Sequence, residues 1–285
     1  MKPAPFEYHA PRTVDDALAL LAEHAAEDGR VLAGGQSLVP TMAFRLARPG
    51  HLIDINGIDA LDRIEARDGA LAIGALVRHA AFHRPVADGP LGALLSAVVR
   101  HVAHYPIRQR GTFCGSLAHA DPAAEWCCVA AALDAEIVAR RSGGERVIPA
   151  AAFFEGVMTT ALEDDELLAE VRLPLLPGDT RFGFQEFSRR AGDFGIAMAL
   201  AAFRLDGGRM REVRIGLGGA EDRARRLKEA EEALEGAAPG EDAFAAAAEA
   251  AAGAIDPMED VSTTAAYRRD LVRVLTRRAL EDAAR

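Results

Sequence analysis

The order of apolar and polar positions predicts a small α/β unit at the start of the chain. Thr13 precedes apolar residues at helical spacing up to Gly29, which predicts a capped helix over 13–28. An apolar strand at 31–33 ends in two glycines, and a second helical stretch and a strand at 52–55 follow. Helix, strand, glycine turn, helix and strand in this order are typical of an α/β unit.

The pattern changes after residue 61, where hairpin signals and longer apolar stripes take over. The sequence predicts hairpins around Arg67-Asp68-Gly69 and Ser142-Gly143-Gly144. It also predicts a helix over 91–102, a glycine-rich loop at 111–121, a helix capped by Asp121 and running through Leu133, and a strand near 167–173.

A proline- and glycine-containing segment at 174–179 is the best candidate for a domain boundary. Beyond it, strands are predicted at about 181–188, 197–205 and 210–217, and helices over 221–235, 241–254 and 263–283. The whole chain is therefore expected to have an α+β fold in which a second, smaller domain combines a small antiparallel sheet with helices.

Composition and charge exclude several classes of protein. The 285 residues carry a net charge of −10, which argues against nucleic acid as a partner. Lysine occurs only at positions 2 and 228, so a phosphate site must rely on arginine, backbone N–H groups or helix ends. The first residues contain no apolar run of signal-peptide length and no later segment is long enough to span a membrane, so we expect a cytoplasmic location.

The cysteines and histidines indicate no metal centre. The three cysteines, at positions 114, 127 and 128, cannot supply the four ligands of an iron–sulfur cluster, and a buried structural role is favoured for the adjacent pair. Histidines at 79 and 83 and at 101 and 104 have helical spacing, but no third ligand accompanies either pair, so we predict no metal ligands.

Two glycine turns are the candidates for ligand binding. One is Leu32-Ala33-Gly34-Gly35-Gln36-Ser37, and the other is Gly111-Thr112-Phe113-Cys114-Gly115-Ser116. Backbone N–H groups in such turns can converge on an anion, and hydroxyls add donors without charge. Either turn alone is more typical of a tight connection, and the chain contains neither GxGxxG nor GxxxxGK[ST]. Spacing alone supports only a weak anion-site hypothesis.

The residues around these turns carry a more specific signal. The strings LAGGQSLVPTMAFRLARP at 32–49 and IRQRGTFCGSLAHADPAAE at 107–125 strongly resemble the flavoprotein (medium) subunits of the xanthine dehydrogenase and carbon monoxide dehydrogenase family. The resemblance extends over essentially the whole chain, through PFEYHAPRTVDDALALL, HLIDIN, FFEGVMTTAL, ELLAEVRLP, SRRAGDF and YRRDLVRVLTRRAL.

The resemblance implies a two-part FAD-binding domain at 1–177, with parts at about 1–57 and 58–177, and a C-terminal domain at 178–285. It implies two loops that hold the FAD pyrophosphate, with Glu125 near the cofactor and two apolar residues near the flavin ring. His119 follows the second loop closely and is a candidate for contact with the cofactor or with a partner. The implied cofactor-binding residues are Leu32, Ala33, Gly34, Gly35, Gln36, Ser37, Leu38, Val39, Val102, Thr112, Cys114, Gly115, Ser116, His119, Glu125 and Leu168.

Two positions depart from the family pattern. Cys114 stands where the family's TxGGS loop has its first glycine, and Gln185 and Glu186 occupy the stretch where the family has a basic residue. If glycine is used at position 114 for a positive φ, cysteine costs on the order of 1 kcal/mol there. We therefore expect Cys114→Gly to bind FAD at least as tightly as the parent.

The implied function is electron transfer within a larger enzyme. Partner subunits would carry molybdopterin and two [2Fe–2S] clusters, in a dimer of heterotrimers, and FAD in this chain would pass electrons to an external acceptor. Two alternatives remain, namely a self-contained FAD-dependent oxidoreductase and an interaction scaffold without flavin. The sequence predicts no catalytic residue in this chain and identifies neither the organic substrate nor the acceptor.

Overall fold

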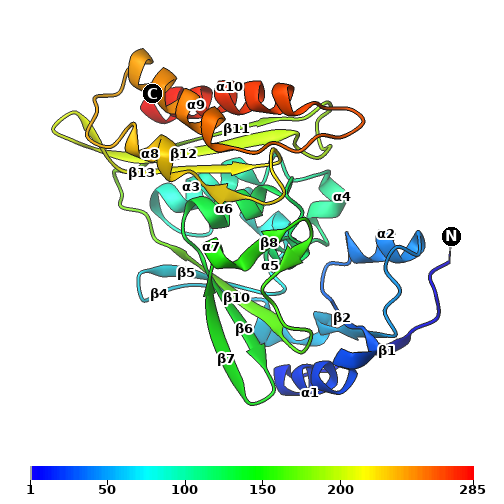
Figure 1. Ribbon diagram of the computed structural model, residues 1–285. Helices are drawn as coiled ribbons and strands as arrows, with labels where there is room; N and C mark the ends of the chain where they lie inside the picture. Colours follow the sequence, from blue (N-terminus) through cyan, green and yellow to red (C-terminus); the bar gives the residue numbers. More distant parts are fainter. Residues whose placement is uncertain (1) are drawn as a thin grey trace.

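The computed structural model describes residues 2–285, which form three stacked layers of sheet with helices between and around them (Figure 1). The first layer is a three-stranded parallel sheet in the order β1-β3-β2. Its elements are β1 Glu7–His9, α1 Val14–His24, the 3₁₀ turn η1 Ala25–Glu27, β2 Gly29–Leu32, α2 Leu38–Ala43 and β3 His51–Asp54.

The second layer is a five-stranded antiparallel sheet in the order β4-β5-β10-β6-β7. Its strands are β4 Ile64–Arg67, β5 Ala70–Gly74, β6 Glu136–Arg141, β7 Gly144–Pro149 and β10 Leu167–Pro174. The other elements of this part are η2 Ile55–Gly57, η3 Asp59–Leu61, η4 His79–His83, α3 Gly89–Val98, α4 Tyr105–Arg108, α5 Phe113–His119, α6 Glu125–Ala132, α7 Ala150–Phe153 and the small pair β8 Phe154–Gly156 and β9 Thr159–Thr160.

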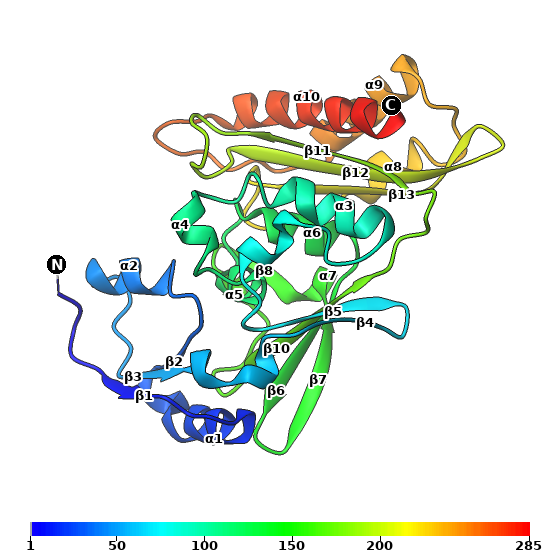
Figure 2. The same cartoon turned by 180° about the vertical axis from the view of Figure 1, so that it is seen from behind.

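The third layer is a four-stranded antiparallel sheet in the order β11-β12-β13-β14. It consists of β11 Arg181–Phe187, β12 Ala197–Asp206, β13 Arg209–Gly218 and β14 Arg225–Arg226, followed by α8 Lys228–Glu232, α9 Glu241–Ala254 and α10 Ala265–Ala284. Helices α9 and α10 cover its outer face, at the end of the molecule opposite α1 (Figures 1 and 2). The prediction of an antiparallel sheet with helices at the end of the chain is confirmed.

Strand β12 belongs to two hydrophobic cores at once. Met198, Leu200 and Ala202 are buried among the side chains of the middle layer. The alternate residues Ala199 and Ala201 are buried against the C-terminal helices. Because successive side chains of a strand point to opposite faces, the C-terminal sheet is apolar on both sides. Helices α3 and α6 of the middle layer pack against this inner face.

Most predicted elements are present, and the differences are local. The first helix is capped as predicted, because Thr13 Oγ1 accepts a hydrogen bond from the N–H of Asp16. The stretch 221–235 is not one helix, since only α8 is helical there. Asp121 does not cap a helix beginning at Pro122, because Asp121 Oδ1 accepts from Ala123 N in a tight turn and α6 starts at Glu125.

Candidate functional site

The first glycine turn connects β2 to α2 and leaves backbone donors free. Gly34 is buried, and Gly35 has φ +70°, a conformation that favours glycine. The side chain of Gln36 closes the turn by donating to the carbonyl of Gly34 at 3.0 Å. Within residues 2–285, the N–H groups of Gly35, Gln36 and Ser37 have no protein acceptor. The turn can therefore offer several N–H groups to an anion.

The second glycine turn is a short helix, α5, where the sequence predicts a loop. Thr112 is its N-cap, and Thr112 Oγ1 accepts a hydrogen bond from Gly115 N at 3.0 Å. A Cβ atom on Gly115 would lie 2.6 Å from the same oxygen. Glycine at position 115 therefore allows the threonine side chain to cap the helix. The hydroxyl of Thr112 is engaged within the chain, and Ser116 lies in the following turn, half-buried.

The explanation offered for glycine at position 114 is wrong for this chain. Cys114 has helical conformation and is absent from the residues of positive φ, so its backbone is not strained. The side chain is buried, and its thiol donates to the carbonyl of Ile73 at 3.3 Å. Burial raises the pKa of the Cys114 thiol well above its ordinary value. Cys114 is thus a packed core residue and not a reactive thiol.

The two turns touch each other. A Cβ atom on Gly34 would lie 2.4 Å from the carbonyl oxygen of Arg110 and 2.6 Å from the Cα of Gly111. No side chain fits in that space, so glycine at position 34 allows direct contact between the backbones of the two turns. The contact brings together the residues that the sequence predicts as two halves of one site.

Hydrogen bonds of Arg78 connect the two turns. Its guanidinium donates to Asn56 Oδ1 and to the carbonyl of Arg110, each at 2.5 Å. Asn56 in turn donates to the carbonyl of Ala33 at 2.8 Å. Burial, with Arg110 nearby, lowers the pKa of Arg78. This chain of hydrogen bonds fixes the distance between the turns. It could not be predicted from the sequence, because its members lie on four separate segments.

A buried histidine, His79, packs against the second turn. His79 is buried against Gly111, and its Nδ1 accepts a hydrogen bond from Trp126 Nε1 at 2.9 Å. Burial, with Arg108 and Arg78 adding to the effect, lowers the pKa of His79 to about 4. His79 is therefore a buried histidine with a ring nitrogen hydrogen-bonded within the chain. Its neighbour in the predicted pair, His83, accepts from Arg108 Nε at 3.1 Å.

The other predicted cofactor residues lie around α5. Val102 and Leu168 are both buried in the hydrophobic core, and Leu168 stands on β10, against which α5 packs. Glu125 is buried at the start of α6, which also contacts α5, and His119 is half-buried in the last turn of α5. Leu38 and Val39 begin α2, and the Val39 side chain is about half exposed (51%).

One carboxyl group of the middle layer, Glu125, and one of the C-terminal layer, Glu186, are buried. Burial raises the pKa of Glu125 to about 7 and that of Glu186, which also feels the charge of Glu125, to about 8. Glu186 Oε2 is buried without a hydrogen-bond partner in the described chain, and His101 Nδ1 lies 3.8 Å from it. The raised pKa favours the protonated form of Glu186, which stands at the stretch where the family has a basic residue.

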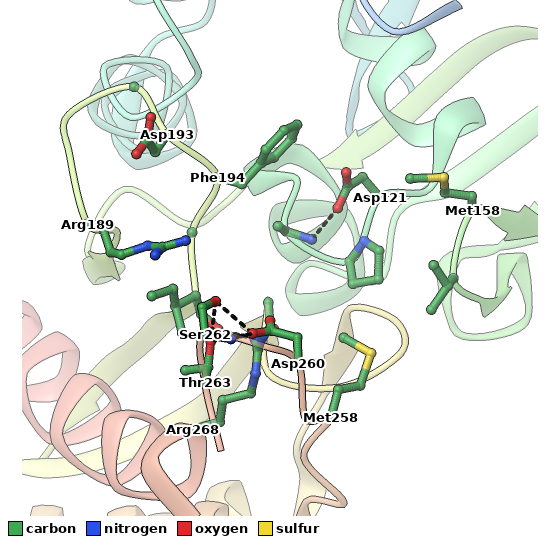
Figure 3. Close-up of a pocket in the computed structure, with 17 residues that line it drawn as sticks. Asp121, Met158, Arg189, Asp193, Phe194, Met258, Asp260, Ser262, Thr263 and Arg268 are labelled. Carbon is green, nitrogen blue, oxygen red and sulfur yellow. Dashed lines mark hydrogen bonds and ion pairs between the residues drawn. The ribbon is translucent and has the colours of Figure 1, made fainter. Parts of the chain in front are cut away.

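A cavity of about 520 Å³ opens beside the end of α5 (Figure 3). Its walls come from the segment after α5, the turn before β9, the SRRAGDF segment and the loop before α10. Asp260 there accepts from Arg268 Nη2 at 2.6 Å. The cavity-lining side chains that could meet a ligand include Asp121, Met158, Arg189, Asp193 and Phe194. The sequence analysis quoted the SRRAGDF string, which contains Arg189, but did not predict the cavity. Neither glycine turn lines it.

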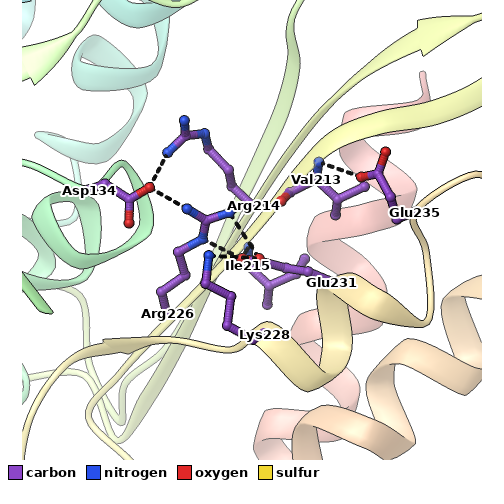
Figure 4. A network of polar contacts seen from close by, with 8 residues as sticks. All are labelled: Asp134, Val213, Arg214, Ile215, Arg226, Lys228, Glu231 and Glu235. Atoms are coloured by element: carbon purple, nitrogen blue, oxygen red, sulfur yellow. Dashed lines mark hydrogen bonds and ion pairs between the residues drawn. The ribbon is translucent and has the colours of Figure 1, made fainter.

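A polar network joins the middle and C-terminal layers on another side of the molecule (Figure 4). Asp134 accepts from Arg214 Nη1 at 2.9 Å and also from Arg226. Arg226 further donates from Nε to Glu231 Oε1 at 2.6 Å. Glu231 accepts from the N–H of Ile215 at 2.9 Å, which fixes α8 against β13. Residues 134 and 226 are thus linked by charge across the two layers.

The comparisons with known proteins agree with this architecture. Residues 4–176 match the family described as the FAD binding domain in molybdopterin dehydrogenase, and residues 182–283 match the CO dehydrogenase flavoprotein C-terminal domain. The chain belongs to this flavoprotein family. The predicted resemblance is confirmed, and an FAD-binding domain is present in this medium subunit.

Relatives of the medium subunit match it from end to end. It is 37% identical over 283 residues to the nicotine 6-hydroxylase medium subunit of Paenarthrobacter nicotinovorans, and the match covers 99% of each chain. It is 34% identical to the carbon monoxide dehydrogenase medium chain of Hydrogenophaga pseudoflava, covering 99% of this chain and 98% of the relative.

Solved structures confirm the fold of the medium subunit. Carbon monoxide dehydrogenase from Hydrogenophaga pseudoflava, in a form that lacks the Mo-pyranopterin moiety of the molybdenum cofactor, superimposes with a TM-score of 0.95 at 36% identity and covers 100% of this chain and 99% of that one. Quinoline 2-oxidoreductase from Pseudomonas putida 86 gives a TM-score of 0.91 at 37% identity, with 100% and 98% covered. Over residues 2–285, no helix has the length and apolar character needed to cross a membrane.

Proposed function

We propose that this medium subunit binds FAD non-covalently between its two glycine turns and transfers electrons from the [2Fe–2S] clusters of a partner subunit to an external acceptor. The observation that carries the proposal is the direct contact of Gly34 with Arg110 and Gly111. The contact supports one joint site, and its free N–H groups suit a pyrophosphate. Burying the anionic oxygens of a pyrophosphate without hydrogen-bond donors would be costly.

The residues present fit such a cofactor. The free N–H groups of Gly35, Gln36 and Ser37 would hold phosphate oxygens, and the exposed Arg110 would add positive charge. The shape of the site would be set by the remaining residues of 32–39 and by Thr112, Cys114, Gly115 and Ser116. The residues nearer the flavin would be Val102, Leu168, His119 and Glu125. Cys114 would contribute only through its backbone and its packing.

FAD, when bound, supplies a group that can take up and release electrons singly or in pairs. The chain contributes position and environment. Arg78 and Asn56 hold the two turns at a fixed separation. Burial near α5 and α6 raises the pKa values of Glu125 and Glu186, which favours the uncharged form of each carboxyl group.

We further propose partners and a domain division. A large molybdopterin subunit and a small iron–sulfur subunit would assemble with this chain, as a dimer of heterotrimers, and the chain would divide at 177/178. The proposal is supported by relatives named as medium subunits and by the two family matches, which end at 176 and begin at 182.

Acid precipitation of the purified chain tests the cofactor. All yellow chromophore should appear in the supernatant as FAD, whereas FMN or flavin in the pellet would refute the proposal. Gly34→Val should lose most FAD because its side chain forces the two turns apart. Gly178→Val is the matched control, because a Cβ atom there meets no atom within 4 Å. Equal FAD retention by both variants would contradict the joint site.

Co-expression with the neighbouring open reading frames tests the assembly. We expect a complex that contains molybdenum, iron and FAD, and no turnover of an organic substrate by this chain alone. Turnover by the isolated chain would favour a self-contained oxidoreductase, and a folded chain without flavin would favour the scaffold.

A further inference from the structure

Three histidines from distant parts of the sequence meet at one end of the parallel sheet. His9 ends β1, His24 ends α1 and His51 begins β3. Each ring brings a nitrogen within 4.8 Å of a nitrogen of the other two. Neither glycine turn takes part, because the first turn follows the opposite, carboxyl end of β2, while His51 pairs with Gly29 at its start.

We propose that His9, His24 and His51 form a binding site for a divalent transition-metal ion, with Zn²⁺ as the representative ion. Imidazole nitrogens suit zinc, nickel and copper, and three of them are enough for a four-coordinate site completed by a carboxylate or water. The site is independent of the proposed FAD function.

Two of the three rings already hold a pair of nitrogens at suitable spacing. His9 Nε2 and His51 Nδ1 are 3.0 Å apart. Two nitrogens bound to one tetrahedral zinc ion at its usual bond length lie roughly 3.3 Å apart. His24 Nδ1 is buried and has no hydrogen-bond partner in the described chain. An unpaired buried nitrogen beside two others is a polar group that a metal ion would satisfy.

The carboxylates around the cluster have the positions of supporting and completing ligands. Glu27 Oε2 lies 3.0 Å from His51 Nε2, the ring nitrogen opposite the one that faces His9. A ligating histidine commonly donates its other N–H to a carboxylate in this way, which orients the ring. Glu7 pairs with His51 in the sheet and brings Oε2 to 3.9 Å from His51 Nδ1, so it is the candidate fourth ligand.

The scaffold holds the three rings at close range and leaves an open side. A Cβ atom on Gly29 would lie 2.9 Å from the carbonyl oxygen of His24, and one on Gly50 would lie 2.7 Å from that of Glu27. Glycine at both positions lets the end of α1 approach the start of the sheet. Because the side chains of Glu7 and Glu27 are 75% and 64% exposed, an ion can enter from solvent.

Binding requires one adjustment of the rings. His24 and His51 stack with their centroids 3.7 Å apart and their planes 7° from parallel. Lone pairs of parallel rings do not converge on one point, so at least one ring must rotate about its side-chain bonds. His24 is free to do so, since its unpaired nitrogen gives up no hydrogen bond.

Calorimetric titration of the tag-free, FAD-loaded chain with ZnCl₂, after treatment with a chelator, tests the site. We expect one ion per chain, an affinity that falls as the pH is lowered because protons compete for the imidazoles, and a higher melting temperature with the ion bound. Glu27→Gln should weaken binding about 10- to 100-fold. His24→Gln should weaken it more, because it removes a ligand.

The control is His83→Gln, a histidine outside the cluster, which should bind zinc like the parent. FAD content and circular dichroism show whether each variant is folded, so that a misfolded variant is not counted as a loss of the site. If the parent binds no stoichiometric zinc, the cluster is a hydrogen-bonded stack and the proposal fails. Equal weakening by His24→Gln and His83→Gln would also overturn it, whatever the outcome for FAD.

Discussion

At residue 114 this chain has a cysteine where the family pattern has a glycine. Its backbone is helical and its thiol is packed and hydrogen-bonded, so cysteine here relieves no strain and causes none. The reason for expecting an advantage of glycine at this position, a positive φ, is therefore absent.

We predict that Cys114→Gly destabilises the chain by about 1 to 2 kcal/mol, because it places glycine in a helix and empties a buried volume. Cys114→Ala should cost less, since it keeps the helix propensity. Urea unfolding curves in excess FAD measure both. A glycine variant as stable as the parent would show that the backbone at position 114 is under strain after all.

The buried carboxyl group of Glu186 makes stability depend on pH. Burial raises its folded-state pKa from 4.5 to about 8. Between these values the folded chain keeps a proton that the unfolded chain has released, so the free energy of unfolding falls as the pH rises through this window. Glu125, with a pKa of about 7 for the same reason, adds to the fall over the lower part of the window.

Glu186→Gln removes the larger contribution. We predict that its stability relative to the parent increases from pH 5 to pH 8, by on the order of a few kcal/mol at most. Denaturant unfolding at several pH values gives the difference, with the exposed Glu229→Gln as the control. A difference that is constant over this range would mean that Glu186 is ionised in the folded chain.

At the level of elements, the proposed site depends on how β2, η2, η4 and α5 are held together. Arg78 makes two hydrogen bonds that connect them, one to Asn56 and one to the carbonyl of Arg110. Lysine has the same charge but cannot make both bonds with the same geometry.

Arg78→Lys should therefore loosen the two turns. We expect a loss of about 1 to 3 kcal/mol in the stability of the FAD-loaded chain and faster release of FAD during gel filtration. Arg63→Lys, at an exposed position, is the control. If the two variants retain FAD equally, the turns are held by the contact at Gly34 alone.

The sequence predicted strongly patterned elements well and short ones poorly. The capped helix at Thr13 and the hairpins at 67–69 and 142–144 form because their signals are local. Strand β1 was missed, since its three residues are mostly exposed and are held by β3 more than forty positions later. Helix α5 was taken for a loop because its glycine, which usually marks a turn, serves the Thr112 cap.

Only those parts of the candidate site that lie within sequence motifs could be predicted. Family strings identified the two turns, but not their contact at Gly34, the Arg78 bridge or the histidine cluster. Each of these joins residues more than 20 positions apart, for example Arg78 with Arg110 and His9 with His51. Periodicity and spacing carry no information about such pairs, which only the packing of the layers brings together.

At the level of the whole molecule, Asp134 connects the middle and C-terminal layers by charge. Its backbone has φ +53°, a conformation that asparagine also tolerates. Asp134→Asn therefore removes the charge without disturbing the turn, and leaves Arg214 and Arg226 without their shared carboxylate.

We predict a loss of about 1 kcal/mol or less, because the side chain of Asp134 is half exposed, and a smaller loss as salt is added. Fluorescence of Trp126, the single tryptophan, follows unfolding of the middle layer. Asp206→Asn, in an exposed hairpin, is the control. A loss that does not change with salt would show that the contact acts through shape and not through charge.

Strand β12, with one face in each hydrophobic core, makes the two halves of the chain one cooperative unit. Cutting the chain near residue 177 would leave Met198, Leu200 and Ala202 of one fragment, and the helices that cover them in the other, exposed to water. Neither fragment should then fold alone, although each matches a family of its own. Calorimetry of the intact chain should show a single endotherm, with a van't Hoff enthalpy equal to the calorimetric one. The boundary at 177 would in that case separate two families that were joined in evolution, but it would not separate two units that unfold independently.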